Sequence, residues 1–252
     1  MNTSQFSLEG KVALITGGSR GIGYATALGF AGAGANVVVS SRRLPDLKKV
    51  SEEIKGLGRR SLAVTTDVRN TGNLGNLVNE VKKEFGRIDI LVNSAGTAAM
   101  RSLLEIDEQA WDEVMGVNLK GLFFLSQAVV RVMKEHGGGS IIHLASSAGI
   151  RPGAWPLYAI SKAGVIMATK VMAREWAQYN IRVNAVAPGM VKTDLTEPLW
   201  NNPEHLEDKL RQTPMRRIAE PEEIVGAIIY LASDAASYVT GSSISLDAGM
   251  TI

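Results

Sequence analysis

The chain has 252 residues, of which 45% are hydrophobic and 21% are charged, so it can bury one sizeable core and is not expected to be disordered. Its 27 basic and 25 acidic residues give a formal net charge of +2 without a long basic run, which argues against nucleic acid as a partner. Because it has no cysteine, no run of about 18 apolar residues and no secretion-type N-terminus, the sequence excludes disulfides and thiolate metal sites and predicts a cytoplasmic protein without a membrane partner.

Short β-branched runs alternate with longer segments of helical spacing, a pattern typical of a parallel sheet flanked by helices. In chain order, the first half of the sequence predicts a strand over 11–16, a helix over about 21–33, strands over 37–40 and 62–64, a helix around 74–85 and a strand over 88–92. The second half predicts a helix over about 108–134, a strand over 140–144, a helix over about 156–178, a strand over 181–186, a helix beginning at 221 and a strand over 243–246. Since no repeat or low-complexity linker interrupts this order, we expect one α/β domain over residues 1–252.

A glycine-rich turn lies between the first predicted strand and the first predicted helix. Gly17, Gly21 and Gly23 follow a G-x-x-x-G-x-G spacing, where the commoner dinucleotide pattern is G-x-G-x-x-G. Such loops are often plain turns, but between a strand and a helix the free amides at the helix N-terminus can bind a pyrophosphate. The position of the turn therefore indicates a dinucleotide site.

The end of the second predicted strand indicates which nicotinamide cofactor is bound. An acidic residue there would bind a free ribose 2′-hydroxyl and repel a 2′-phosphate, whereas this chain has Ser41, Arg42 and Arg43. Arg42, together with Arg20 across the loop, supplies guanidinium donors suited to a phosphate. Solvated surface charges are the alternative explanation for this pair. At this position we favour NADP(H).

Tyr158 and Lys162 are four residues apart in a predicted helix, so they share one face of it. A free phenol has a pKa near 10, and a nearby ammonium lowers it, which would make Tyr158 a general acid or base. The spacing alone is common on helix surfaces. In combination with the glycine turn, it indicates a nicotinamide-dependent oxidoreductase.

From about residue 10 to residue 249 the chain resembles the short-chain dehydrogenase/reductase family. The matching segments are the T-G-x-x-x-G-x-G turn at 16–23, an N-N-A-G segment at 93–96 with Ser94 in second place, the helix asparagine Asn118, the serine Ser146 that opens S-x-x-G twelve residues before Tyr158, and the P-G-x-x-x-T segment at 188–193. The resemblance implies a single-domain Rossmann-type, doubly wound, seven-stranded parallel sheet and hydride transfer between a nicotinamide and a carbonyl or alcohol carbon.

The resemblance also implies the roles of four catalytic residues. Tyr158 would donate a proton to the carbonyl oxygen, and Ser146 would polarise that oxygen. Lys162 would bind the ribose hydroxyls and lower the tyrosine pKa, while Asn118 would hold a water that links Lys162 to solvent.

The expected cofactor is NADP, with Asp67 and Val68 near the adenine and Val191 and Thr193 near the carboxamide. The complete set of expected cofactor-binding residues is Gly17, Ser19, Arg20, Gly21, Ile22, Gly23, Ser41, Arg42, Arg43, Asp67, Val68, Asn93, Ala95, Gly96, Tyr158, Lys162, Pro188, Gly189, Val191 and Thr193. No metal is expected.

Three residues near these motifs need separate interpretation. Ser94 replaces the second asparagine of the family pattern, which could alter a hydrogen bond beside the cofactor. Ser147 adjoins Ser146 and could exchange roles with it, although the S-x-x-G spacing favours Ser146. His143 lies in a predicted strand and is interpreted as a packing residue, neither a base nor a ligand.

The segment from Leu195 to Thr213, within about 190–215, is expected to be a substrate lid, because insertions at the carboxyl edge of a parallel sheet often cover the ligand. Together with Ile150, Trp155 and Leu157 it suggests a largely apolar pocket. Simple packing on the protein body is the alternative.

The preferred function is an NADP(H)-dependent carbonyl reductase that acts on small or medium apolar ketones. One alternative is a 3-oxoacyl-[acyl-carrier-protein] reductase, which is weakened because Gly137 and Tyr179 occupy the positions of the basic docking residues, although Lys134 and Arg174 lie nearby. Another is an NAD-dependent polyol or sugar dehydrogenase. A non-catalytic NADP sensor would not need the complete catalytic set. The resemblance also implies a homotetramer paired through the two long helices.

Overall fold

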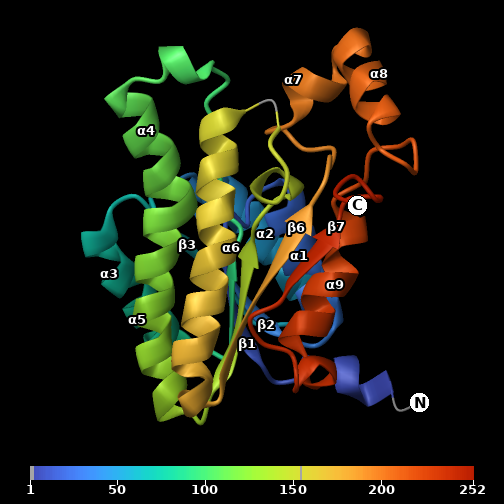
Figure 1. The fold of residues 1–252 in the computed structure, drawn as a ribbon. Coiled ribbons are helices and arrows are strands. Elements are labelled where there is room, and N and C mark those ends of the chain that lie inside the picture. The colour runs from blue at the N-terminus through green and yellow to red at the C-terminus, as the bar shows by residue number, and fades with distance from the viewer. Residues whose placement is uncertain (1–2, 154) are drawn as a thin grey trace.

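The computed structural model describes residues 3–153 and 155–252, and these residues form a seven-stranded parallel sheet (Figure 1). Its order is β3-β2-β1-β4-β5-β6-β7, so the chain leaves β1 in one direction and returns to its other side at β4. The strands are β1 (Val12–Thr16), β2 (Asn36–Ser41), β3 (Ser61–Thr65), β4 (Ile90–Asn93), β5 (Gly139–Leu144), β6 (Ile181–Pro188) and β7 (Ser243–Leu246). The predicted fold class is confirmed, and every predicted strand is present.

Helices cover both faces of the sheet (Figure 1). On one face lie α3 (Leu74–Phe85), α4 (Glu108–Met115), α5 (Leu122–Glu135) and α6 (Pro156–Trp176). On the other face lie α1 (Gly21–Gly32), α2 (Leu44–Gly56) and α9 (Glu222–Ala232). Two short helices, α7 (Glu197–Trp200) and α8 (Pro203–Arg211), project beyond the sheet from the segment after β6.

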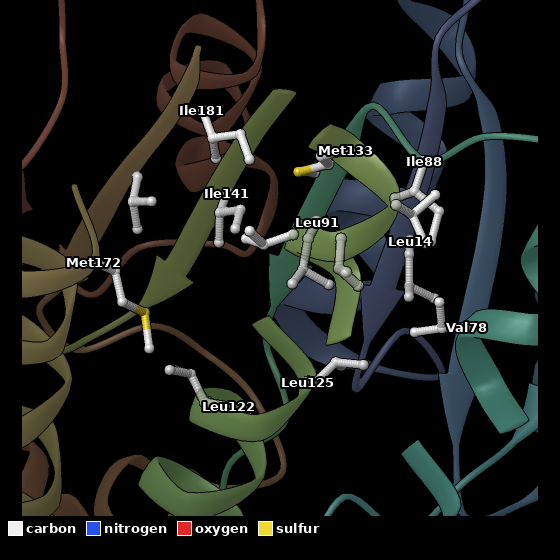
Figure 2. Packing of buried hydrophobic residues seen from close by; sticks show 14 of the residues in the cluster. Leu14, Val78, Ile88, Leu91, Leu122, Leu125, Met133, Ile141, Met172 and Ile181 are labelled. Atoms are coloured by element: carbon white, nitrogen blue, oxygen red, sulfur yellow. The ribbon is translucent and has the colours of Figure 1, made fainter. Parts of the chain in front are cut away.

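The strands read as continuous apolar runs because both of their faces are buried. In β1, Leu14 packs toward α3 and α5, while Ala13 and Ile15 pack toward α1 and α9. Figure 2 shows the first of these clusters, in which strand residues such as Leu91 and Ile141 lie near residues of the covering helices. The two clusters hold the sheet rigid, so the loops at its carboxyl edge have a fixed base.

The structure differs from the predicted elements at two places that bear on the site. The sequence analysis did not predict α2, although Leu47, Val50 and Ile54 give it an apolar stripe that packs on the sheet. The predicted helix over 108–134 is interrupted by a π-helical turn at Gly116–Gly121. This turn packs tightly on the loop after β3. The packing is so close that a Cβ at Gly121 would lie 2.6 Å from the Val68 carbonyl oxygen.

The glycines after α5 confirm the predicted helix end, since Gly137 and Gly138 have φ values of +85° and +123°. Within residues 3–153 and 155–252, no helix is both long enough and apolar enough to cross a lipid bilayer.

Candidate active site

A cavity of about 820 Å³ opens at the carboxyl edge of the sheet, where the strand order reverses. Its wall follows the carboxyl ends of β1 to β6, with Arg42 and Asp67 toward one end and Ser146 and Tyr158 toward the other. Ligands of doubly wound folds bind at this kind of crevice. Most of the predicted site residues meet here although they are far apart in the chain.

The glycine turn after β1 packs directly against the turn after β4. Gly17 has φ +66°, and a Cβ there would lie 2.9 Å from Ser94 O and Ala95 N. A Cβ at Gly23 would lie 2.3 Å from the Gly17 carbonyl oxygen. Glycine is therefore required at both positions for steric reasons.

The N-terminus of α1 points its free amides at this cavity. The residue that precedes α1, Arg20, makes no side-chain capping bond, and the first turn contains no acidic residue. The first amides of a helix have no partner within the helix and carry partial positive charge. They can therefore bind a phosphate group at this point.

Three arginines line the cavity, and the structure distinguishes between them. Arg20 pairs with Asp194 at 2.8 Å, and Arg43 pairs with Asp46 at 3.0 Å. Arg42 forms no ion pair with any residue that the structure describes. Of the predicted phosphate-binding cations, Arg42 is the one whose guanidinium is available.

Asp67 lines the same part of the cavity but is engaged by its neighbour Arg69. The Arg69 guanidinium donates to the Asp67 carboxylate at 2.6 Å, and this hydrogen bond is the main reason that the pKa of Asp67 is lowered. The carboxylate is thus held ionised and turned toward its own loop.

Ser146 and Tyr158 line the other end of the cavity. The Ser146 side chain acts to lower the pKa of Tyr158, and its Oγ accepts a hydrogen bond from Ala148 N at 3.1 Å. Ser147 does not line the cavity, and its hydroxyl faces Met250 Sδ at 4.0 Å. The structure therefore favours Ser146, as the S-x-x-G spacing predicted.

Lys162 lies one helical turn from Tyr158 with its ammonium buried. Its Nζ donates to the carbonyl oxygen of Leu144 at the end of β5 and lies 5.5 Å from the centre of the Tyr158 ring. Burial lowers the pKa of Lys162 to about 8, because the charged form loses its hydration.

The expected lowering of the tyrosine pKa is not found in this structure. Burial raises the pKa of Tyr158, and this outweighs the opposite effect of the Ser146 hydrogen bond. The Lys162 ammonium does not add a lowering effect because it is directed at the Leu144 carbonyl. The proximity of the two side chains is confirmed, but the predicted electrostatic consequence is wrong for this arrangement.

Asn118 lies in the π-helical turn and is almost completely buried. Its amide nitrogen donates to Thr97 O and Ser161 Oγ, and its amide oxygen accepts from Thr97 N, each at 2.9 Å. It does not line the cavity, but a Cβ at Gly96 would lie 3.7 Å from its oxygen and 3.9 Å from Lys162 Nζ. Asn118 therefore supports the cavity wall beside the lysine.

Asn93 is the predicted cofactor residue that the cavity wall does not include. Its buried side-chain amide donates to Ser126 Oγ at 3.0 Å and faces His143 Nδ1 at 3.2 Å. This amide ties β4 to α5 and β5, and a cofactor contact by Asn93 stays a prediction. The side chain of Ser94 lies instead near the glycine turn, 3.1 Å from a Cβ built at Gly23.

His143 is completely buried in β5, and burial lowers its pKa to about 3. This agrees with the interpretation as a packing residue, because the imidazole stays neutral over the physiological range.

The cavity wall also includes residues that the motifs did not predict, and it omits three of the predicted substrate residues. Thr97 and Met100 follow the turn after β4, and Asp194 follows the P-G-x-x-x-T segment. Their positions directly after matched motifs were the available signal. Ile150, Trp155 and Leu157 do not line the cavity; Leu157 is buried, and the Trp155 ring packs edge-on against Tyr158.

Comparison with known proteins agrees with this arrangement. A family model described as "Enoyl-(Acyl carrier protein) reductase" matches residues 17–251. The chain belongs to the short-chain dehydrogenase/reductase family. It is therefore an oxidoreductase, and this family binds a nicotinamide cofactor.

Two curated relatives of this dehydrogenase/reductase span nearly its whole length. It is 44% identical to a Thermotoga maritima 3-oxoacyl-[acyl-carrier-protein] reductase, covering 97% of this chain and 99% of the relative. It is 41% identical to an Escherichia coli 2-dehydro-3-deoxy-D-gluconate 5-dehydrogenase, covering 99% and 98%. A solved Beutenbergia cavernae structure with bound NADP, provisionally named an NAD(P)-dependent gluconate 5-dehydrogenase, superposes with a TM-score of 0.93 at 38% identity, covering 98% of each chain.

The residues at the cavity fit a dinucleotide. Gly17 and Gly23 leave no room for a side chain, and the first amides of α1 are free to donate hydrogen bonds to an anion. Arg42 forms no ion pair within the described part of the chain. These features correspond to the pyrophosphate and the adenosine end of a nicotinamide cofactor.

Replacing Gly23 with alanine should disrupt this cradle. The added methyl group would collide with the Gly17 carbonyl oxygen, a backbone atom, so the turn must shift. We expect the Kd for NADPH, measured by isothermal titration calorimetry, to rise at least about tenfold. Gly226→Ala in α9 is the matched control, because a Cβ there would meet no atom within 4 Å. Equal affinities of Gly23→Ala and the unmodified protein would contradict this interpretation.

The buried ammonium of Lys162 should make stability depend on pH. Its pKa is about 8 in the folded protein and 10.5 in the reference state, so between these values the unfolded chain binds more protons. Stability from this group therefore rises with pH across this window. The free energies of unfolding of the unmodified protein and of Lys162→Met are measured with urea at each pH. From pH 7.5 to 10.5, the value for the unmodified protein should rise relative to that for Lys162→Met by up to roughly 3 kcal/mol.

The control is Lys49→Met on the exposed side of α2, for which the difference in the free energy of unfolding should not change with pH. A difference between the unmodified protein and Lys162→Met that stays constant with pH would show that the lysine charge is not buried at a cost.

Proposed function

We propose that this protein is an NADP(H)-dependent reductase that interconverts a ketone and a secondary alcohol. The observation that carries the proposal is the meeting of Ser146, Tyr158 and Lys162 at one end of a cavity whose other end presents Arg42, which has no ion-pair partner among the described residues. The glycine turn, which suits a pyrophosphate, lies between these two ends. It therefore separates the proton donor Tyr158 from the phosphate-binding cation Arg42.

The proton chemistry rests on the hydroxyl pair. Bound NADPH supplies the hydride. Tyr158, whose pKa is raised by burial, keeps its proton at neutral pH and can donate it to the substrate oxygen as negative charge develops there. The Ser146 hydroxyl, which lines the cavity together with Tyr158, can donate to the same oxygen and hold it in place. We expect Lys162 to bind the ribose hydroxyls of the cofactor, because it lines the cavity beside the tyrosine ring.

The choice of NADP(H) over NAD(H) is supported by Ser41 and Arg42 at the end of β2. A carboxylate that would repel a 2′-phosphate is absent from this strand end, and a guanidinium that would bind one lines the cavity. The bound NADP in the Beutenbergia cavernae structure is consistent with this choice.

Two other substrate classes are favoured by specific observations. The 44% identity to the Thermotoga maritima enzyme supports 3-oxoacyl thioester reduction. Against it, the Lys134 ammonium lies 3.7 Å from the centre of the Tyr179 ring, so this candidate docking cation is already engaged. The 41% identity to the Escherichia coli enzyme supports a sugar-derived substrate, the class expected of a polyol or sugar dehydrogenase.

A lid over about 190–215 is also part of the proposal. Leu195 and Thr196 line the cavity, whereas no residue of α7 or α8 in the described chain does. Trp200 in α7 is tied to the cavity rim by a hydrogen bond from its indole nitrogen to Thr193 O at 3.3 Å. The segment is therefore anchored at the rim and free to close farther out.

A homotetramer is proposed from an exposed apolar surface on α4, α5 and α6. Its residues are 41–58% exposed in the single chain and comprise Trp111, Phe123, Phe124, Ile160, Met167 and Val171. Exposed patches of this kind mark protein interfaces. Light scattering should give four times the chain mass of 26.9 kDa, and Met167→Glu should lower it. The mass of a single chain for the unmodified protein would contradict the proposal.

Turnover of a substrate panel tests the function. The panel contains apolar ketones, β-ketoesters, 3-oxoacyl thioesters and sugar-derived ketones, each assayed with NADPH and with NADH by loss of absorbance. We expect apolar ketones to be reduced with NADPH, and Tyr158→Phe to lower kcat at least about 100-fold while the Kd for NADPH stays nearly the same. Tyr238→Phe, at a fully exposed tyrosine, is the control.

Normal turnover by Tyr158→Phe would remove its assigned role. A clear preference for NADH would remove the argument from Arg42, and reduction confined to thioesters or sugar derivatives would select one of the alternatives.

A further inference from the structure

An ion pair crosses the cavity at its middle. Arg20, in the turn before α1, donates from Nη1 to Asp194 Oδ2 at 2.8 Å, and Asp194 follows β6. In the sheet, β6 is separated from β1 by β4 and β5, so the pair joins opposite walls. The backbones approach each other here as well, since a Cβ at Gly21 would lie 3.2 Å from Thr193 Cγ2.

The position of Asp194 is unusual because the cavity is built to take an anion. Three other carboxylates lie on its wall. Asp46 and Asp67 pair with arginines three and two residues away on their own segments, and Glu113 lies 3.9 Å from Arg69. The first two pairs stabilise local structure. Asp194 instead pairs with a residue 174 positions away in the sequence, on the turn where a pyrophosphate would lie.

The pair can be displaced easily. Its two side chains are 66% and 62% exposed, and exposed ion pairs contribute little to stability. A phosphate presents more negative charge than a carboxylate and accepts paired hydrogen bonds from a guanidinium. Cofactor phosphates would therefore compete with Asp194 for Arg20.

We propose that Asp194 determines cofactor affinity and specificity by holding the Arg20 guanidinium away from the cofactor phosphates. Its carboxylate weakens the binding of NADP(H) more than that of NAD(H), because the 2′-phosphate adds nearly two negative charges to the ligand. Weaker binding appears mainly as faster release, so Asp194 also speeds cofactor exchange. This inference rests on the proposed binding of NADP(H) at this cavity.

The experiment measures the Kd of NADP⁺ and of NAD⁺ by isothermal titration calorimetry, without turnover. The proteins compared are the unmodified enzyme, Asp194→Asn, Arg20→Gln and the double variant, all at one salt concentration. We expect Asp194→Asn to tighten NADP⁺ about three- to tenfold and NAD⁺ by less. Because the effect acts through Arg20, it should disappear in the Arg20→Gln background.

Glu84→Gln is the matched control. Glu84 pairs with Arg60 at 2.7 Å with similar exposure, and Arg60 directly precedes β3 at the opposite edge of the sheet. Removing this carboxylate should leave both Kd values unchanged, although it changes the net charge equally.

Weaker or unchanged NADP⁺ binding by Asp194→Asn would overturn the inference. An equal gain in NADP⁺ affinity from Asp194→Asn in the unmodified enzyme and in the Arg20→Gln variant would also overturn it. Failure of the proposed function is seen separately, in the unmodified enzyme, as tighter binding of NAD⁺ than of NADP⁺. In that case the effect of Asp194→Asn on NADP⁺ still decides the role of Asp194.

Discussion

The buried ammonium of Lys162 is the interaction on which the arrangement of the site depends. It joins α6 to the end of β5 through the Leu144 carbonyl, two residues before Ser146. Removing an ammonium from water is costly, so it must keep a strong acceptor, and this requirement fixes the distance between the helix and the strand. Tyr158, one turn earlier on α6, is thereby held against Ser146.

Close packing on the α6 backbone explains the glycine of the S-x-x-G motif. A Cβ at Gly149 would lie 2.6 Å from the Lys162 carbonyl carbon, so only glycine lets this loop pack on α6. On the other side, Asn118 ties the π-helical turn to Thr97 and to Ser161 of α6. Ser146 thus lies on a different segment from Tyr158 and Lys162, and close packing and a few buried hydrogen bonds set the separation of the two segments.

The charges along the cavity form two unequal groups. At the reacting end, burial shifts the pKa values of Tyr158 and Lys162 in opposite directions, each toward its neutral form. At the cofactor end the charged groups are exposed, and Arg20 and Arg43 are compensated by nearby carboxylates. The first group is suited to chemistry in a site of low polarity, whereas the second adjusts how firmly an anionic ligand is held.

Much of the fold could be predicted from the sequence because parallel strands and their helices carry distinct periodicities. Leu74, Leu77, Val78 and Val81 mark α3 directly, and all four are buried. The stripe of Leu47, Val50 and Ile54 carried a similar signal for α2, but the charged residues around it concealed the helix. The π-helical turn at Gly116–Gly121 had no such signal, since it reflects the approach of the Val68 loop.

The sequence by itself determined the order of the elements, the glycine turn and the Tyr158–Lys162 spacing, because these depend on local spacing and on residue type, and the family resemblance added Asn118 and Ser146. Only the tertiary structure decided which side chains reach the cavity. It turned Asn93 into the sheet, directed the Lys162 ammonium to a backbone carbonyl and joined Arg20 to Asp194 across 174 residues. These outcomes depend on burial and on partners distant in the chain, which local spacing does not encode.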